Sequence, residues 1–116
     1  LSLQPCRIEL SKLLRKPVQM ATDCVGAVVA KQVHALQPGE VLLLENLRYY
    51  PAEEKPYLDP AFAEKLAAWG DVYVNDAFGA AHRKHTSTFT IASYFPQTAA
   101  EGFLMEKEIK ALSNLL

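Results

Sequence analysis

The chain has 116 residues, of which 50% are hydrophobic and 22% are charged, and its formal net charge at pH 7 is −1. This length is typical of one domain, and this composition is typical of a soluble globular protein. The near-neutral charge argues against a general nucleic-acid-binding protein, and no apolar run approaches the ~20 residues that a membrane-spanning helix needs.

Apolar periodicity and chain-breaking residues predict an alternation of helices and strands. The expected elements, in chain order, are a helix over 4–15, a strand over 18–21, a helix over 24–36, a strand over 41–44, a loop over 45–59, a helix from Asp59-Pro60 to Gly70, a strand over 72–74 and a helix over 101–115. Residues 76–95 are ambiguous between strand, loop and short helix.

The alternation indicates the fold class. Strands separated by helices form βαβ units with right-handed crossovers, which predicts an α/β fold with a parallel sheet and helices on both faces. The strands 41–44 and 72–74 lack polar alternation, as is typical of strands covered on both faces. Three strands make a small sheet, so we expect this segment to be an incomplete part of a larger one.

Both of these apolar strands run into a cationic loop. Arg48 follows the first strand, and the cluster His82-Arg83-Lys84-His85 follows the second, after the small residues Gly79 and Ala80. Ligands of open α/β sheets bind where parallel strands end, and a guanidinium offers two planar donors to phosphate or carboxylate. The pattern predicts a site for a small anion. The alternatives are that Arg48 pairs with Glu53 or Glu54 at the surface and that the cluster is a solvated basic loop.

Other polar residues invite simpler interpretations. Asp76 could act as a general base, a magnesium ligand or an orienter of Arg83, but a cap on the following turn is the favoured interpretation. For Asn46, too, a capping role is favoured over a role in chemistry. His82 and His85 could share a metal, but only Asp76 lies close enough in sequence to be a third ligand, so no metal site is predicted.

Glu53 and Glu54 are interpreted as solvated loop charges. Cys6 and Cys24 have neither a CxxC nor a zinc spacing, and we interpret both as buried, reduced thiols.

Three segments carry a resemblance to a known family. Residues 42–49, LLLENLRY, followed by Glu53-Glu54, resemble the "LLENLR(F/Y)…EE" segment of phosphoglycerate kinases. Residues 70–85, GDVYVNDAFGAAHRKH, are similar to the family's "GDVYVNDAFGTAHRAHSS". Residues 102–108, GFLMEKE, are similar to its "GFLMEKEL". The three motifs occur in the family's order, and the resemblance covers essentially the whole chain.

The resemblance implies a cytoplasmic glycolytic enzyme, a monomer with two Rossmann-like domains. It would transfer a phosphoryl group between 1,3-bisphosphoglycerate and ADP, with magnesium bound alongside ADP or ATP on the C-terminal domain. No nucleic acid or membrane partner is implied. This chain would be the second half of the N-terminal domain, which binds 3-phosphoglycerate.

The resemblance also assigns roles to individual residues. Arg48 and Arg83 match the arginines that bind the substrate phosphate. The basic patch of the family's substrate site matches His82, His85, Gly79 and Ala80. Ala80 replaces the family's usual Thr or Ser, so any hydroxyl contact there is lost, and Lys84 replaces a small residue and adds charge at the rim.

Several family motifs are absent from these 116 residues. They include the opening "D-x-N-x-P" strand, the catalytic arginine that follows it, "H-L-G-R-P" and the "G-G-A-K" segment of the nucleotide domain. We therefore expect no catalytic residue in this segment and no activity from it alone. The alternatives are a non-catalytic α/β binding module that kept the anion pocket, and an unrelated sugar-phosphate enzyme that converged on two arginines.

Overall fold

The structure is a computed structural model that describes residues 1–80 and 82–115. The chain forms two compact units, Leu1–Tyr50 and Pro51–Leu116. Each unit contains one pair of parallel strands. No helix in the described part of the chain is long and apolar enough to cross a membrane.

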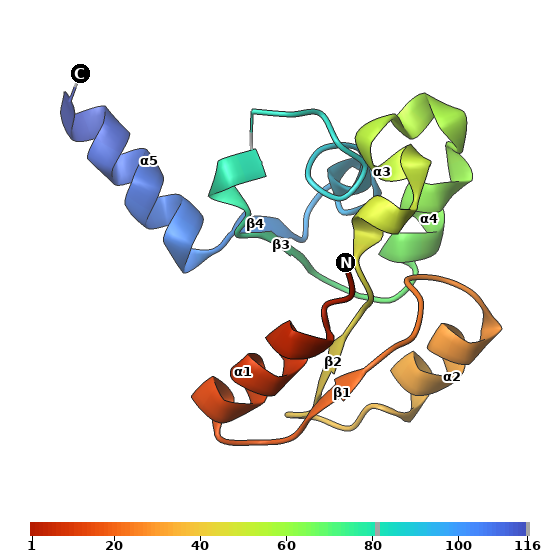
Figure 1. The fold of residues 1–116 in the computed structure, drawn as a ribbon. Coiled ribbons are helices and arrows are strands. Elements are labelled where there is room, and N and C mark those ends of the chain that lie inside the picture. The colour runs from red at the N-terminus through yellow and green to blue at the C-terminus, as the bar shows by residue number, and fades with distance from the viewer. Residues whose placement is uncertain (81, 116) are drawn as a thin grey trace. The chain divides into compact units, whose positions relative to one another are not determined.

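The first unit is built on a βαβ crossover. Its elements are α1 (Gln4–Leu14), β1 (Val18–Met20), α2 (Ala27–Ala35), β2 (Val41–Leu43) and the 3₁₀ helix Leu47–Tyr49. The strands pair in parallel with Val18 opposite Val41, and in Figure 1 they run between α1 and α2. The buried apolar residues of this unit are Val18, Ala21, Cys24 and Val29.

Chain-breaking residues set the ends of α1. A proline lies in its first turn, and Arg15 ends it in the left-handed conformation with φ of 56°. The N–H of Arg15 donates to Lys12 O at 3.3 Å, which satisfies a carbonyl of the last turn. Pro17 prevents continuation, so the chain enters β1 one residue later.

The second unit has a short strand pair and a helical core. Its elements are α3 (Pro51–Glu54), the 3₁₀ helix Pro56–Leu58, α4 (Ala61–Ala67), β3 (Tyr73–Asn75), the 3₁₀ helices Phe78–Ala80 and Thr90–Tyr94, β4 (Ala99–Glu101) and α5 (Phe103–Leu115). Phe62 and Leu66 of α4 are buried, as are Ile91 and Phe95, and α4 packs on the 3₁₀ helix 90–94. The Tyr73 and Phe95 rings stack with their centroids 5.9 Å apart.

The structure confirms the α/β class and corrects several details of the prediction. The strands form two separate parallel pairs, and β4, which pairs with β3, was not predicted. The loop expected over 45–59 contains α3 and two 3₁₀ helices. The ambiguous region 76–95 contains turns and 3₁₀ helices in its described residues, and no strand.

The burial predictions were partly wrong. Val72 and Val74 are 61% and 55% exposed, so β3 is not a covered strand, and the residues of β2 are half-buried. Val and Tyr are enriched in strands, which explains why a strand was correctly predicted here although its burial was not. Among the two cysteines, Cys24 is buried as expected, whereas Cys6 is exposed; both are free thiols.

Candidate anion-binding site

Arg48 lies at the carboxyl end of β2, where the sequence predicts it. The side chain of Asn46 accepts the Arg48 N–H at 3.0 Å, and Asn46 O accepts the Tyr49 N–H at 3.1 Å. This confirms the capping role of Asn46 and fixes the backbone from which Arg48 extends. Arg48 itself is exposed.

A tyrosine–aspartate pair anchors the far end of the same turn. The Tyr50 hydroxyl donates a short hydrogen bond to Asp23, which also accepts the Cys24 N–H at 2.7 Å. The bond to Asp23 raises the pKa of Tyr50 from 10.0 to about 12, and the same bond lowers the pKa of Asp23. The segment after β1 is thereby tied to the segment after β2. No sequence pattern indicates this pair.

Glu45 organises the start of the chain around this edge. Its carboxylate accepts the N–H of Leu3 at 2.8 Å, the hydroxyl of Ser2 at 2.7 Å and the N–H of Asn46 at 2.8 Å. These bonds, led by the one from Leu3, lower the pKa of Glu45. Glu45 therefore stabilises the local structure. Its carboxylate, which lies close to Arg48 in the sequence, stays ionised.

In the second unit, Asn75 shapes the loop that follows β3. Its side-chain oxygen accepts the Ala77 N–H at 3.0 Å, and its amide nitrogen donates to Thr88 O at 3.3 Å. Gly79 and Ala80 lie in the short 3₁₀ helix between these two contacts. A Cβ on Gly79 would meet nothing within 4 Å, so packing does not require glycine there.

The cationic cluster divides into an exposed part and a buried part. His82, Arg83 and Lys84 are exposed, and Arg83 Nε donates to His82 Nε2 at 3.2 Å. Lys84 Nζ lies 5.2 Å from the centroid of the Phe89 ring.

His85 differs from its neighbours because its residue is only 7% exposed. Its carbonyl accepts the N–H groups of Phe89 at 2.9 Å and Thr90 at 3.3 Å, which places it at the start of a turn. His85 is therefore part of the packed interior of this unit, whereas the other three residues of the cluster are exposed.

Asp76 caps a helix that is distant in sequence. Its Oδ1 accepts the Met105 N–H at 2.9 Å, in the first turn of α5. The cap on the turn that follows β3 comes from Asn75 instead. The prediction that Asp76 caps a backbone N–H was thus right, but it named the following turn and not the start of α5. Local sequence does not reveal a partner so distant in the chain.

The expectation that Glu53 is a solvated loop charge was wrong. Glu53 is only 4% exposed. Its carboxylate accepts the N–H of Ser87 at 3.1 Å and a short hydrogen bond from the Ser87 hydroxyl. Glu54, its neighbour, is exposed as expected.

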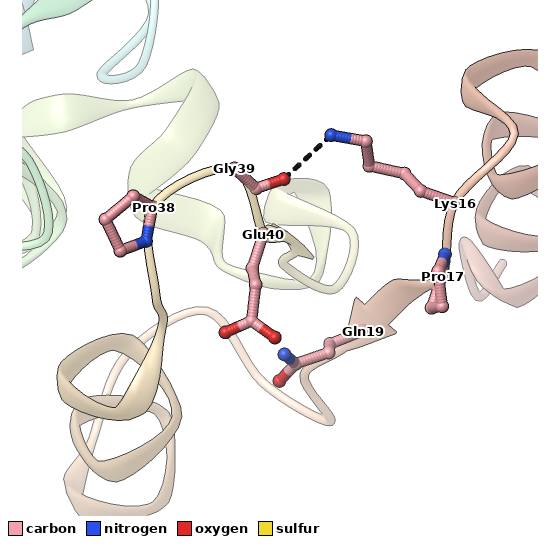
Figure 2. A pocket seen from close by; sticks show the side chains of 6 residues that line it. All are labelled: Lys16, Pro17, Gln19, Pro38, Gly39 and Glu40. Carbon is pink, nitrogen blue, oxygen red and sulfur yellow. Dashed lines mark hydrogen bonds between the residues drawn. The ribbon is translucent and has the colours of Figure 1, made fainter.

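Among residues 1–80 and 82–115, no three His, Cys, Asp or Glu side chains are placed to hold a metal ion. A hollow of about 360 Å³ lies at the amino ends of β1 and β2, the opposite edge from Arg48. In it, Lys16 Nζ donates to Gly39 O at 2.9 Å (Figure 2). Its lining residues are Lys16, Pro17, Gln19, Pro38, Gly39 and Glu40.

Comparison with known proteins identifies the family. The family model described as phosphoglycerate kinase matches residues 1–116. The chain belongs to the phosphoglycerate kinase family. It is 56% identical over 116 residues to the phosphoglycerate kinase of Moorella thermoacetica, and 51% identical over 115 residues to that of Chlamydia felis. These alignments cover 100% and 99% of this chain but only 28% of each relative.

A solved structure agrees with this assignment. The crystal structure of phosphoglycerate kinase from Pyrococcus horikoshii OT3 superposes with a TM-score of 0.86 at 36% sequence identity. The match covers 97% of this chain and 29% of that one. The incomplete Rossmann-like fold is thus that of a segment of a phosphoglycerate kinase. Arg48 lies in the first unit and Arg83 in the second, and their convergence on one anion stays a prediction.

Proposed function

We propose that this chain supplies part of the 3-phosphoglycerate site of a phosphoglycerate kinase. The enzyme would transfer a phosphoryl group between 1,3-bisphosphoglycerate and ADP in glycolysis. The observation that carries the proposal is that Arg48 and Arg83 are both exposed on segments that follow the carboxyl ends of parallel strands. In this family, such an edge is suited to a phosphorylated acid.

The proposed mechanism asks these residues to position charge. Arg48 and Arg83 hold the phosphate that is not transferred, through charge-assisted hydrogen bonds from their guanidinium groups. His82, Gly79 and Ala80 border the substrate, and His85 supports the loop from inside. Phosphoryl transfer depends mainly on positioning and charge neutralisation, so neither arginine needs to transfer a proton. Closure of the enzyme around the substrate would exclude water.

The remaining partners belong to the rest of the enzyme. The chain forms, in this proposal, the second half of the N-terminal phosphoglycerate-binding domain, and ADP or ATP binds with Mg²⁺ on a nucleotide domain elsewhere. Among the described residues, no three His, Cys, Asp or Glu side chains are placed to hold Mg²⁺. The enzyme would be cytoplasmic and monomeric, and these 116 residues alone would be inactive.

The test uses the full-length protein. It should form ATP from 1,3-bisphosphoglycerate and ADP, and Arg48→Ala and Arg83→Ala should each weaken 3-phosphoglycerate binding by about 1–3 kcal/mol, the range for a lost charged hydrogen bond. Lys65→Ala, which removes an exposed cation on α4, is the matched control and should leave the affinity unchanged. Unchanged affinity in both arginine variants would refute their roles. ATP formation by the isolated segment would refute its inactivity.

A further inference from the structure

A buried carboxylate anchors the loop that carries Arg83. Glu53 lies in α3, and both of its carboxylate oxygens accept hydrogen bonds from Ser87. The backbone adds two more bonds: Thr86 N–H donates to Glu53 O at 2.8 Å, and Thr86 Oγ1 donates to Ala52 O at 2.6 Å. Residues 86 and 87 are thus fixed to residues 52 and 53, more than 30 positions earlier in the chain.

The fixed segment is connected in turn to the strand and to Arg83 itself. The Tyr73 hydroxyl of β3 donates to Ser87 O at 2.7 Å. The Thr88 hydroxyl donates to Arg83 O at 3.1 Å, and Thr88 O accepts the Asn75 side chain. The Glu53 carboxylate is therefore connected to the Arg83 carbonyl by its hydrogen bonds to Ser87, the peptide bond from Ser87 to Thr88, and the hydrogen bond from the Thr88 hydroxyl.

The energetics favour a role beyond surface charge. Burying a carboxylate is costly unless hydrogen bonds compensate for the lost water. The donors to Glu53 belong to Ser87, in the loop, and not to its own helix. A shorter side chain at this position would leave the Ser87 N–H and hydroxyl without this acceptor. The loop would then keep the two Thr86 bonds to α3 but lose the two bonds that hold Ser87 to it.

We propose that Glu53 is a positioning residue that holds the Arg83 loop in its anion-binding geometry. The inference rests on the proposed function, because it concerns how the same 3-phosphoglycerate site is set up. Glu53 does not touch the substrate in this account. It acts through Ser87, and its loss displaces Arg83 without removing a charge from the anion site.

The experiment measures KM for each substrate in the direction that consumes ATP and 3-phosphoglycerate, using full-length protein. Glu53→Ala should raise the KM for 3-phosphoglycerate by about 10- to 100-fold, the effect of a small misplacement of a binding group, and leave the KM for ATP unchanged. Glu53→Gln should recover most of the affinity, because its amide oxygen still accepts the Ser87 N–H and the Ser87 hydroxyl can accept from its NH₂. Glu64→Ala, an exposed carboxylate on α4, is the matched control.

Hydrogen exchange of the Ser87 amide provides a second readout. It should accelerate in Glu53→Ala and stay slow in Glu64→Ala. An accelerated amide with an unchanged KM for 3-phosphoglycerate would overturn the inference, because Glu53 would then be only structural. An equal rise in both KM values would also overturn it.

The wild-type protein separates this inference from the proposed function on which it rests. A wild-type protein that does not use 3-phosphoglycerate overturns both, whereas one that uses it leaves the inference to be decided by the Glu53 variants. If Glu53→Ala does not fold, Ser87→Ala is measured instead, because it removes the hydroxyl bond to Glu53 and keeps the N–H bond. An intermediate rise in the KM for 3-phosphoglycerate then supports the inference, and no rise overturns it.

Discussion

Gly102→Ala is expected to disrupt the start of α5. A Cβ at Gly102 would lie 2.4 Å from both Cγ and Oδ1 of Asp76, far inside van der Waals contact. Asp76 cannot move away freely, because its Oδ1 accepts the Met105 N–H at 2.9 Å and caps the helix. The Gly102 N–H also donates to Asn75 O at 2.8 Å, which holds the backbone in place. The added methyl group must therefore displace Asp76 and break the cap.

The magnitude follows from the three effects involved. Loss of a helix cap costs about 0.5–2 kcal/mol, and overpacking a fixed site costs about 1–3 kcal/mol. Replacing glycine by alanine returns about 0.4–1 kcal/mol by restricting the unfolded chain. We therefore expect the opening free energy of the first turn of α5 to fall by about 0.5–4.5 kcal/mol.

Native-state hydrogen exchange of the Met105 amide measures this quantity locally, so the remainder of a larger protein does not obscure it. Each 1.4 kcal/mol corresponds to about a tenfold loss of protection. Gly79→Ala is the control, because its Cβ meets nothing within 4 Å, and protection at Met105 should stay unchanged. Asp76→Gly should make a subsequent Gly102→Ala change nearly neutral. If Met105 protection in Gly102→Ala equals that in Gly79→Ala, the steric reasoning is wrong.

Two further predictions follow from the first unit. Tyr50→Phe should remove the phenol that ionises near pH 12 in an ultraviolet titration. Because the folded pKa of Tyr50 is raised, the stability from its hydrogen bond to Asp23 is full below pH 10 and is lost as the pH rises toward 12. The folded pKa of Asp23 is lowered, so its contribution to stability is lost as the pH falls below 3.8 and through that folded pKa. A Tyr50→Phe protein whose stability has the wild-type pH profile would contradict the pairing. Thiol labelling followed by peptide mapping should modify exposed Cys6 rapidly and buried Cys24 slowly, and equal rates would contradict the packing around Cys24.

Local signals explain why much of the fold was predictable. Helical periodicity placed α1, α4 and α5 within a few residues, and Pro17 marked the end of the first helix. β4 was missed because Ala99–Glu101 has no β-branched residue, and it is extended because it pairs with β3. Burial was predicted less well, because apolar residues of α5 such as Phe103 and Leu115 are largely exposed in this segment.

The same distinction holds for the candidate site. The positions of Arg48 and Arg83 at strand ends follow from local sequence order, as does the turn capped by Asn46. The roles of Glu53 and Asp76 depend on partners about 30 residues away, Ser87 and Met105, and nothing in the local composition reveals such partners. A glutamate in an acidic loop has the same local pattern whether it is solvated or buried.

The central claim is that Arg48 and Arg83 bind one phosphate together. A crystal structure of the full-length protein with 3-phosphoglycerate tests it most directly. We expect nitrogen atoms of both guanidinium groups about 2.7–2.9 Å from oxygens of the same phosphate. A complex in which either side chain points away from that phosphate, or in which the phosphate lies at another edge, would contradict the account.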